Sequence, residues 1–301
     1  MYFLNRIGTT IAANYQGAGT LNPVVMPSGK MYAFFINFPS NDPSYSYSTD
    51  YGVTWSAPVA FKACTCTNMA VWYDRWSGID ADIVHVVYTD SGVDDTFYRT
   101  LDLSNNTLGT ESTVFLGAST AGGGALSITR ARGGNIMVAT CIDAGAEYDT
   151  RKSIDGGVNW TSPAEVFEAA TTDQLILLPG WNADSQDIQC IFWDASADEI
   201  SVKRYDDSAD TWTETSIATT MADVVASTTT YPHFAASVDL ENSQNVLIAW
   251  SAVDLLNADL RCWTINDTTI TEKTAIITDS TDDQGFAALS INGSVWTAFY
   301  C

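Results

Sequence analysis

The stretch Met31-Tyr-Ala-Phe-Phe-Ile-Asn-Phe38 is short, apolar and aromatic, which is typical of a buried β-strand. Five similar segments follow: Asp82-Ile-Val-His-Val-Val-Tyr-Thr89, Asn135-Ile-Met-Val-Ala-Thr-Cys-Ile142, Asp187-Ile-Gln-Cys-Ile-Phe-Trp-Asp194, Asn245-Val-Leu-Ile-Ala-Trp-Ser-Ala252 and Ser294-Val-Trp-Thr-Ala-Phe-Tyr-Cys301. They recur roughly every 50 residues, and repetition at a fixed period of this length is the signature of a repeat architecture.

Each repeat contains three further strand-like segments. A first strand, such as Leu126–Thr129, precedes the repeated segment, which is the second strand. A third strand with an alternating pattern, such as Tyr148–Lys152, and a fourth strand follow it. Four antiparallel strands in about 50 residues make one blade of a β-propeller. The sequence therefore predicts an all-β fold, a single six-bladed β-propeller domain over residues 1–301. We expect blades at about residues 21–62, 67–117, 122–170, 173–220 and 230–279, and a sixth that joins 283–301 to 1–16.

The sixth blade predicts how the ring closes. Residues 283–301 supply only a first and a second strand, whereas Tyr2–Arg6 and Thr9–Asn14 have the pattern of a third and a fourth strand. Pairing two strands from each end removes both free sheet edges. We therefore expect 2+2 closure of the last blade by the N-terminal strands.

A second pattern lies between the third and fourth strands of blades one and three. It has the form S-x-D-x-G-x-T-W, and its residues are Ser48, Asp50, Gly52, Thr54 and Trp55 in the first copy and Ser153, Asp155, Gly157, Asn159 and Trp160 in the second. Aspartate can accept backbone N–H bonds inside a tight turn, glycine permits positive φ, and tryptophan can pack over the sheet. The pattern predicts a structural turn, and blade four keeps a degenerate copy that ends in Thr211-Trp212.

This motif resembles the Asp-box, or BNR repeat, of the sialidase-like β-propeller superfamily. The resemblance implies that the boxes lie on the face away from the active site and serve as scaffold. Sialidases also resemble one another in an arginine triad, a Tyr/Glu nucleophile pair and an Asp acid. Here Arg6-Ile7-Gly8 only partly matches the family's R-I-P motif, and no arginine follows the second strand of blade one. The catalytic set is therefore not recognisable, although the scaffold is.

The composition excludes several classes of partner. The chain has 36 Asp and Glu against 13 Lys and Arg, a net charge of −23, which opposes binding to nucleic acid or to an anionic membrane. No apolar run approaches a membrane span, and Met1–Gly8 lacks the features of a signal peptide. The six cysteines are scattered; we expect reduced thiols, with a metal clip at Cys64-x-Cys66 as the less favoured alternative.

The candidate ligand-binding residues belong to the top face, which we define as the face that carries the turns between second and third strands. Four second strands end in or near an aspartate: Asp90, Asp143, Asp194 and Asp254. Further candidates near this face are Asp42, Asp94, Asp95, Asp282, Asp283, Phe38, Tyr45, Tyr148, Trp193, Tyr231 and His233. Carboxylates here can hydrolyse a glycoside or hold Ca²⁺, and aromatic rings can stack on sugars. The alternatives are that aspartate simply favours turns, that the aromatic rings cap blade ends, and that His85 and His233 are structural.

Two functions follow from these observations. The first is a non-enzymatic propeller that binds a glycan or other protein subunits, plausible as a virion component such as a phage-tail or capsid-attached adhesin. It requires no cofactor, with Ca²⁺ possible, and a virion or extracellular surface as its location. The alternative is a glycoside hydrolase or polysaccharide lyase that uses top-face carboxylates, with His233 or Tyr148 assisting. A purely structural spacer is a third possibility.

Overall fold

The computed structural model describes residues 23–73, 82–117, 126–142, 147–163, 172–182, 184–194, 199–219, 234–254, 257–274, 277–280, 286–291 and 295–300. These residues form β-strands, turns and loops, and none of them is helical. Accordingly, this part of the chain contains no helix that could cross a membrane. The strands form six antiparallel sheets that follow one another in sequence order. The prediction of an all-β fold is confirmed for the described residues.

The first three sheets occupy the N-terminal half. Sheet one contains β1 (Val24–Val25), β2 (Met31–Asn37), β3 (Asp42–Ser48) and β4 (Val59–Ala60). Sheet two contains β5 (Cys66–Tyr73), β6 (Ile83–Asp90), β7 (Asp95–Asp102), β8 (Thr107–Leu108) and β9 (Ser112–Phe115). Sheet three contains β10 (Leu126–Arg130), β11 (Ile136–Ile142) and β12 (Glu147–Ser153).

The other three sheets follow. Sheet four contains β13 (Thr172–Pro179), β14 (Ile188–Asp194), β15 (Glu199–Asp206) and β16 (Thr211–Thr219). Sheet five contains β17 (Phe234–Asp239), β18 (Gln244–Asp254), β19 (Asn257–Asn266), β20 (Thr269–Glu272) and β21 (Ile277–Ser280). Sheet six contains β22 (Phe286–Ile291) and β23 (Val295–Tyr300). The second strands β2, β6, β11, β14, β18 and β23 coincide with the six repeated segments.

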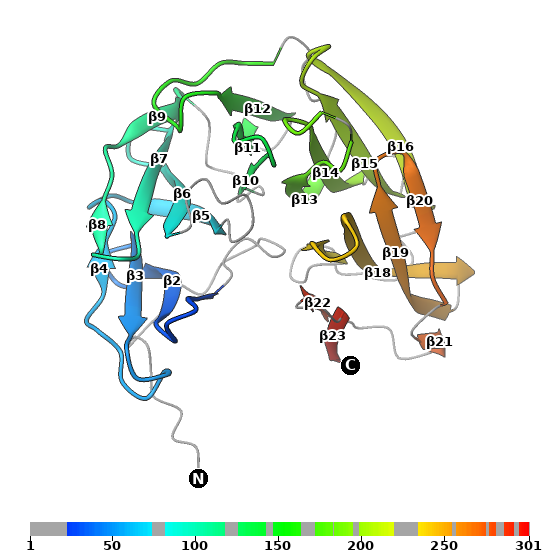
Figure 1. Cartoon of the computed structure of the whole chain (residues 1–301), viewed down its shortest axis with the longest axis horizontal. Coiled ribbons are helices and arrows are strands. Elements are labelled where there is room, and N and C mark those ends of the chain that lie inside the picture. The colour runs from blue at the N-terminus through cyan, green and yellow to red at the C-terminus, as the bar shows by residue number, and fades with distance from the viewer. Residues whose placement is uncertain are drawn as a thin grey trace.

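The sheets stand side by side around a common centre, in chain order from blue to red (Figure 1). The first strands of sheets two to six lie innermost, and contacts run from β5 to β10, from β10 to β13, from β13 to β17 and from β17 to β22. Radial sheets with their first strands at the centre are the arrangement of a β-propeller.

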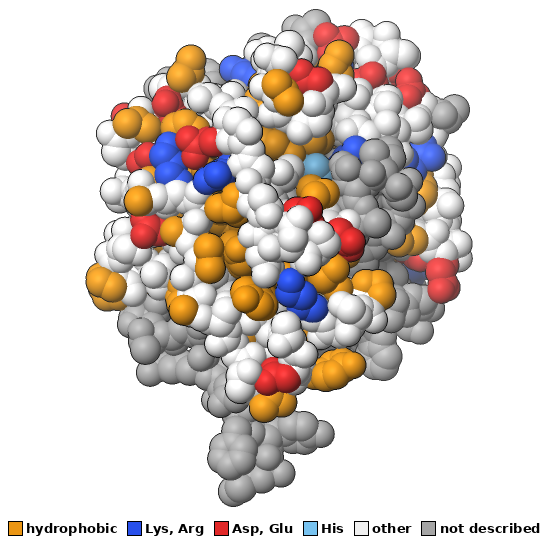
Figure 2. Space-filling model, turned by 60° about the vertical axis from the view of Figure 1, so that its left-hand side comes forward, with side chains coloured by type: hydrophobic (Ala, Val, Ile, Leu, Met, Phe, Trp, Pro, Cys, Tyr) orange, Lys and Arg blue, Asp and Glu red, His pale blue; other side chains and the backbone are white. Residues whose placement is uncertain are grey.

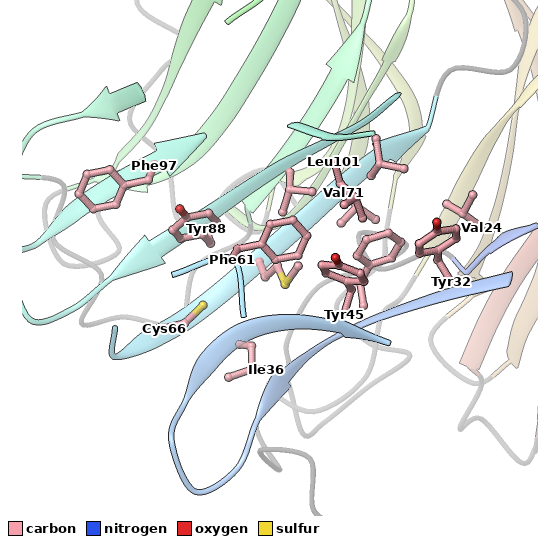
Figure 3. Packing of buried hydrophobic residues seen from close by; sticks show 14 of the residues in the cluster. Val24, Tyr32, Ile36, Tyr45, Phe61, Cys66, Val71, Tyr88, Phe97 and Leu101 are labelled. Carbon is pink, nitrogen blue, oxygen red and sulfur yellow. The ribbon is translucent and has the colours of Figure 1, made fainter. Parts of the chain in front are cut away.

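Hydrophobic cores fill the spaces between neighbouring sheets. Tyr32, Tyr45 and Phe61 of sheet one pack against Tyr88 and Leu101 of sheet two (Figure 3). Three further clusters of buried residues fill the other spaces. One lies between sheets two and three, one between sheets three and four, and one between sheets four and five. Each described sheet between two such clusters is therefore buried on both faces, which removes apolar surface from water and stabilises the packing of neighbouring sheets.

Burial on both faces explains the unbroken apolar character of the second strands. In β14, Cys190 and Phe192 belong to the cluster shared with sheet three, whereas Ile191 and Trp193 belong to the cluster shared with sheet five. Successive side chains of a strand point to opposite faces, so an alternating apolar/polar pattern would leave polar groups in one core. Across the centre, Trp72 of β5 packs against the cluster between sheets four and five.

The turns between third and fourth strands dock on the preceding sheet. The Tyr32 hydroxyl donates to the Leu103 carbonyl oxygen at 2.8 Å and to Asn106 Oδ1 at 2.6 Å, and so ties sheet one to the turn of sheet two. Lys152 of sheet three lies 2.9 Å from Asp207 Oδ1 in the turn of sheet four. The face opposite the top face, called the lower face here, is thus a set of contacts between sheets.

The fourth strand of sheet two is divided. Both β8 and β9 pair with β7, and the two are separated at Gly109–Glu111, where Arg99 Nε donates to the Gly109 carbonyl oxygen at 3.0 Å. Sheet five shows a similar division, because β20 and β21 both pair with β19. In sheet two the interruption leaves Glu111 outside the strands, where it contacts Tyr88.

Candidate functional site

Three second strands end in an aspartate at the same edge of the radial sheets. Asp90, Asp194 and Asp254 are the last residues of β6, β14 and β18. Because each is the second strand of its own sheet, all three ends lie on the top face. Asp143 follows β11 but lies outside the described residues, as do the side chains of Asp194 and Asp254.

Among the four aspartates at the ends of second strands, Asp90 is the one whose side chain the structure describes. Its side chain is buried, its Oδ1 accepts a hydrogen bond from the Gly92 N–H at 3.0 Å, and its Oδ2 lies 3.8 Å from Lys62 Nζ. The same ammonium group lies 3.3 Å from Glu111 Oε1 and 3.3 Å from the centre of the Phe97 ring. One lysine therefore faces two carboxylates and an aromatic ring at the junction of sheets one and two, and it offsets the charge that burial of Asp90 would otherwise leave unpaired.

A tyrosine–glutamate pair lies beside this cluster. The Tyr88 hydroxyl donates to Glu111 Oε2 at 2.6 Å, and burial is the main cause that raises the pKa of Tyr88 above its usual range. Tyr88 is fully buried between the two sheets (Figure 3). A nucleophile must reach its substrate, and so this pair contributes to packing between sheets and not to a reactive centre.

The neighbouring thiols are held in the protonated form. Burial, followed by the charge of Asp90, raises the pKa of Cys64 to about 12, and burial also raises the pKa of Cys66. Both are free thiols in the described chain, and metal binding would need the thiolate. The metal clip at Cys64-x-Cys66 stays a prediction. Within the described ranges no three His, Cys, Asp or Glu side chains are grouped to hold a metal ion. Calcium binding stays a prediction, because it depends mainly on side chains outside those ranges.

The aromatic candidates divide into three groups. Tyr45, Tyr148 and Trp193 are only 1%, 1% and 4% exposed. They belong to the cores between sheets one and two, sheets three and four, and sheets four and five, respectively. They have no ring face open to a sugar, so we correct their assignment as ligand-binding residues. Phe38 is 47% exposed beside the top-face turn of sheet one. Tyr231 and His233 lie outside the described residues.

The described arginines are bound within the chain itself. Arg99, Arg130 and Arg132 donate to backbone carbonyl oxygens. Arg151, Arg204 and Arg261 contact Asp149, Asp267 and Glu272. All six lie on third strands or at the lower ends of first strands. They hold the scaffold together and do not converge on the top face, as an arginine clamp for a substrate carboxylate would require.

The two motif turns have closely matching internal hydrogen bonds. In the first, Ser48 Oγ donates to Asp50 Oδ1 at 2.7 Å and accepts from the Gly52 N–H at 2.8 Å. The Thr54 N–H donates to Asp50 Oδ1 at 2.8 Å. The second turn repeats these contacts through Ser153, Asp155, Gly157 and Asn159, at 2.8, 2.8 and 2.9 Å.

The carboxylates of Asp50 and Asp155 accept these hydrogen bonds in their anionic form. Bonds from Thr54 and from Asn159, respectively, are the largest causes that lower the pKa of Asp50 and of Asp155 to about 2. Gly52 and Gly157 have φ of 84° and 90°, a conformation that favours glycine. The prediction that these residues build structural turns on the lower face agrees with this geometry.

Sequence reasoning missed Lys62 and Glu111. Lys62 follows the fourth strand of sheet one, in the segment that leads to the next blade, and Glu111 lies where the fourth strand of sheet two is interrupted. Their separation of almost 50 residues gives no local signal. The one indication in the sequence was that Lys62, a cation in an acidic chain, lies in a segment that leads to the top face.

Known proteins were compared with the chain at the level of sequence and of structure. A scan against protein-family models and a search of curated proteins both find no match. Among solved structures, the Hadza microbial sialidase Hz136 is similar over 90% of this chain and 60% of its own, with a TM-score of 0.51 and 16% identity. The β-propeller domain of the Trilobed protease from Pyrococcus furiosus is similar over 93% and 77%, with a TM-score of 0.51 and 11% identity.

The NanB sialidase from Streptococcus pneumoniae, as a K499G mutant, is similar over 94% of this chain and 64% of its own, with a TM-score of 0.49 and 12% identity. The chain thus spans less than two thirds of the length of these sialidases. At such identities the similarity concerns the fold. Taken with the radial sheets and the two motif turns, it shows that the chain has a sialidase-like β-propeller scaffold.

Proposed function

We propose that the chain is a propeller that binds a neutral glycan on its top face without catalysis. The observation that carries this proposal is the alignment of Asp90, Asp194 and Asp254 at the ends of β6, β14 and β18, on one face of the ring. Carboxylates accept hydrogen bonds from sugar hydroxyls, and a chain with a net charge of −23 repels anionic ligands. Hz136, one of the solved proteins with a similar fold, is named a sialidase, which supports a glycan as the class of ligand.

Binding is favoured over hydrolysis by the way the described groups are used. Asp90 accepts a hydrogen bond from the Gly92 N–H and pairs with Lys62. The described arginines bind backbone carbonyl oxygens and carboxylates of the scaffold. Figure 2 shows one side of the molecule, on which hydrophobic side chains lie among uncharged surface and charged side chains are dispersed in small groups. An uncharged ligand is held by hydrogen bonds and apolar contact.

A binding assay and a turnover assay together test this proposal. Purified protein is applied to an array of neutral and acidic oligosaccharides, and the same protein is incubated with chromogenic glycosides and acidic polysaccharides. We expect retention on neutral oligosaccharides and no turnover, with weaker binding by Asp194→Asn and Asp254→Asn. Glu241→Gln, which removes one charge from an exposed lower-face turn, is the control. Turnover that disappears in either Asp→Asn variant supports the hydrolase or lyase instead.

The six-bladed, 2+2-closed ring belongs to the same proposal. Its support is the order of the six sheets and the position of β22 and β23 in the last of them. The similar Pyrococcus furiosus domain is described as having an open velcro topology, so closure needs its own test. Hydrogen exchange followed by mass spectrometry provides it: closure predicts protected amides in residues 2–13 and in β23. Fast exchange of residues 2–13 in a folded protein contradicts closure. Placement in a virion stays a prediction from the sequence, which mass spectrometry of purified particles checks.

A further inference from the structure

Two innermost strands share an irregularity at the top face. In sheet two, Cys66 pairs with Asp90 but Met69 pairs with Tyr88, so β5 contains one extra residue. In sheet four, Thr172 pairs with Asp194 but Gln174 pairs with Trp193, so β13 also contains one extra residue. Both bulges follow the residue that pairs with the aspartate ending the second strand. Among the described first strands, β5 and β13 are the two that reach the level of that aspartate, and both have the bulge.

In β5 the bulge brings a polar side chain to the surface. Thr67 is the one exposed residue of this strand, whose next four residues are buried. A β-bulge redirects side chains, and bulges are over-represented beside binding and active sites. β5 and β13 are innermost strands that both contact β10 (Figure 1), so the two bulges lie near the centre of the ring at its top end.

The hydroxyl of Thr67 is held in place from below. Thr67 Oγ1 lies 2.8 Å from Oγ1 of the buried Thr89, and Thr89 Oγ1 also accepts a hydrogen bond from the Asn68 N–H at 3.0 Å. A hydroxyl can make up to three hydrogen bonds, and Thr67 uses one of them in this network. Asp90, the next residue of β6 after Thr89, adds a carboxylate to the same end of the sheet. This gives a fixed, uncharged donor and acceptor at the surface.

We propose that Thr67 contacts the neutral sugar bound at the top face, and that Asp173, the extra residue of β13, occupies the equivalent position in sheet four. The inference rests on the proposed glycan binding and adds the residues that select the ligand. In this proposal, Thr67 and Asp173 both accept hydrogen bonds from the hydroxyl groups of the sugar. An anionic sugar would meet the carboxylate unfavourably.

The test uses the full chain and a matched set of variants. Thr67→Val removes the hydroxyl and keeps the branched shape, whereas Thr67→Ser keeps a hydroxyl. The control Thr213→Val makes the same Thr→Val change at an exposed site in the outermost strand β16. Asp173→Asn is paired with Glu241→Gln. Affinity is measured by titration calorimetry against the neutral oligosaccharide that an array retains best, and thermal unfolding verifies that each variant folds.

We expect Thr67→Val and Asp173→Asn to weaken binding about five- to tenfold each, as the loss of one hydrogen bond predicts. Thr67→Ser and the two controls should stay within about twofold of the unmodified protein, the size of change that ordinary context effects produce. Unchanged affinity in Thr67→Val and Asp173→Asn, with binding intact in the parent, overturns this inference alone. Absence of any neutral-glycan binding by the parent overturns the proposed function and the inference together.

Discussion

The two motif turns, Ser48–Trp55 and Ser153–Trp160, have matching internal hydrogen bonds but different surroundings. In the second turn, Ser112 of sheet two donates to the Gly157 carbonyl oxygen at 2.6 Å, and the Tyr98 ring packs on Gly157. Around Gly52 the nearest atoms belong to Met31 and Trp55 of its own sheet. The comparison teaches that the motif builds its own turn, whereas the cost of changing it depends on whether a neighbouring blade rests on it.

The two turns should differ most in the free energy of unfolding that is lost when their glycines are replaced. Gly157→Ala adds a Cβ at φ of 90° and places it in a steric clash with the Tyr98 ring, whereas the Cβ of Gly52→Ala would lie 3.6 Å from Met31 Sδ. Tyr98 is buried and lies 2.7 Å from His85 Nδ1, so it cannot move away easily. We expect Gly157→Ala to lower the free energy of unfolding by about 3 kcal/mol and Gly52→Ala to lower it by about 1 kcal/mol. Urea unfolding measures both, and equal losses would contradict the role of the neighbouring blade.

The tryptophans should show a smaller difference. Trp160 Nε1 donates to Ser112 Oγ at 3.1 Å and to the Gly157 carbonyl oxygen at 3.2 Å, whereas Trp55 Nε1 donates to the Gly52 carbonyl oxygen at 3.2 Å. We expect Trp160→Phe to cost about 1 kcal/mol more than Trp55→Phe. A double-mutant cycle with Ser112→Ala should reduce this excess, because the shared hydrogen bond is already lost. Additive effects in the cycle would indicate that Ser112 and Trp160 act independently.

The motif serines should show almost no difference. Ser48 and Ser153 are both buried, and each accepts a glycine N–H bond at 2.8 Å. We expect Ser48→Ala and Ser153→Ala to cost about 1 kcal/mol each. Equal shifts of the denaturation midpoint support a self-contained turn. A loss confined to Ser153→Ala would mean that the neighbouring blade, and not the motif, stabilises the turn.

Acid should affect the two turns alike. Hydrogen bonds lower the pKa of Asp50 and Asp155 to about 2 in the folded chain, below the ordinary 3.8. Their stabilisation is therefore complete above about pH 4 and is lost as the pH falls through 2. Urea midpoints measured between pH 5 and pH 2 should decline less steeply in Asp50→Asn and Asp155→Asn, to the same extent. An unchanged decline in both variants would show that other carboxylates control acid unfolding.

Part of the candidate site followed from local pattern and part did not. The ends of β6, β14 and β18 at aspartates were predictable, because strand length and alternation are local properties. The contact of Lys62 with Glu111 was not, since it depends on an interruption in the fourth strand of sheet two. Tyr148 and Trp193 show the same limit: an aromatic residue near a strand end has the same sequence signal whether it faces solvent or a neighbouring sheet.

The sequence by itself determined the all-β class, the order of the repeats and the two motif turns, because each depends on residues close together along the chain. Tertiary structure decided which aspartate meets a lysine, which aromatic rings are buried and which turn supports the next blade. Those outcomes depend on the packing of sheets whose contacting residues lie about 50 positions apart. Burial and charge pairing are properties of that packing, and no local pattern encodes them.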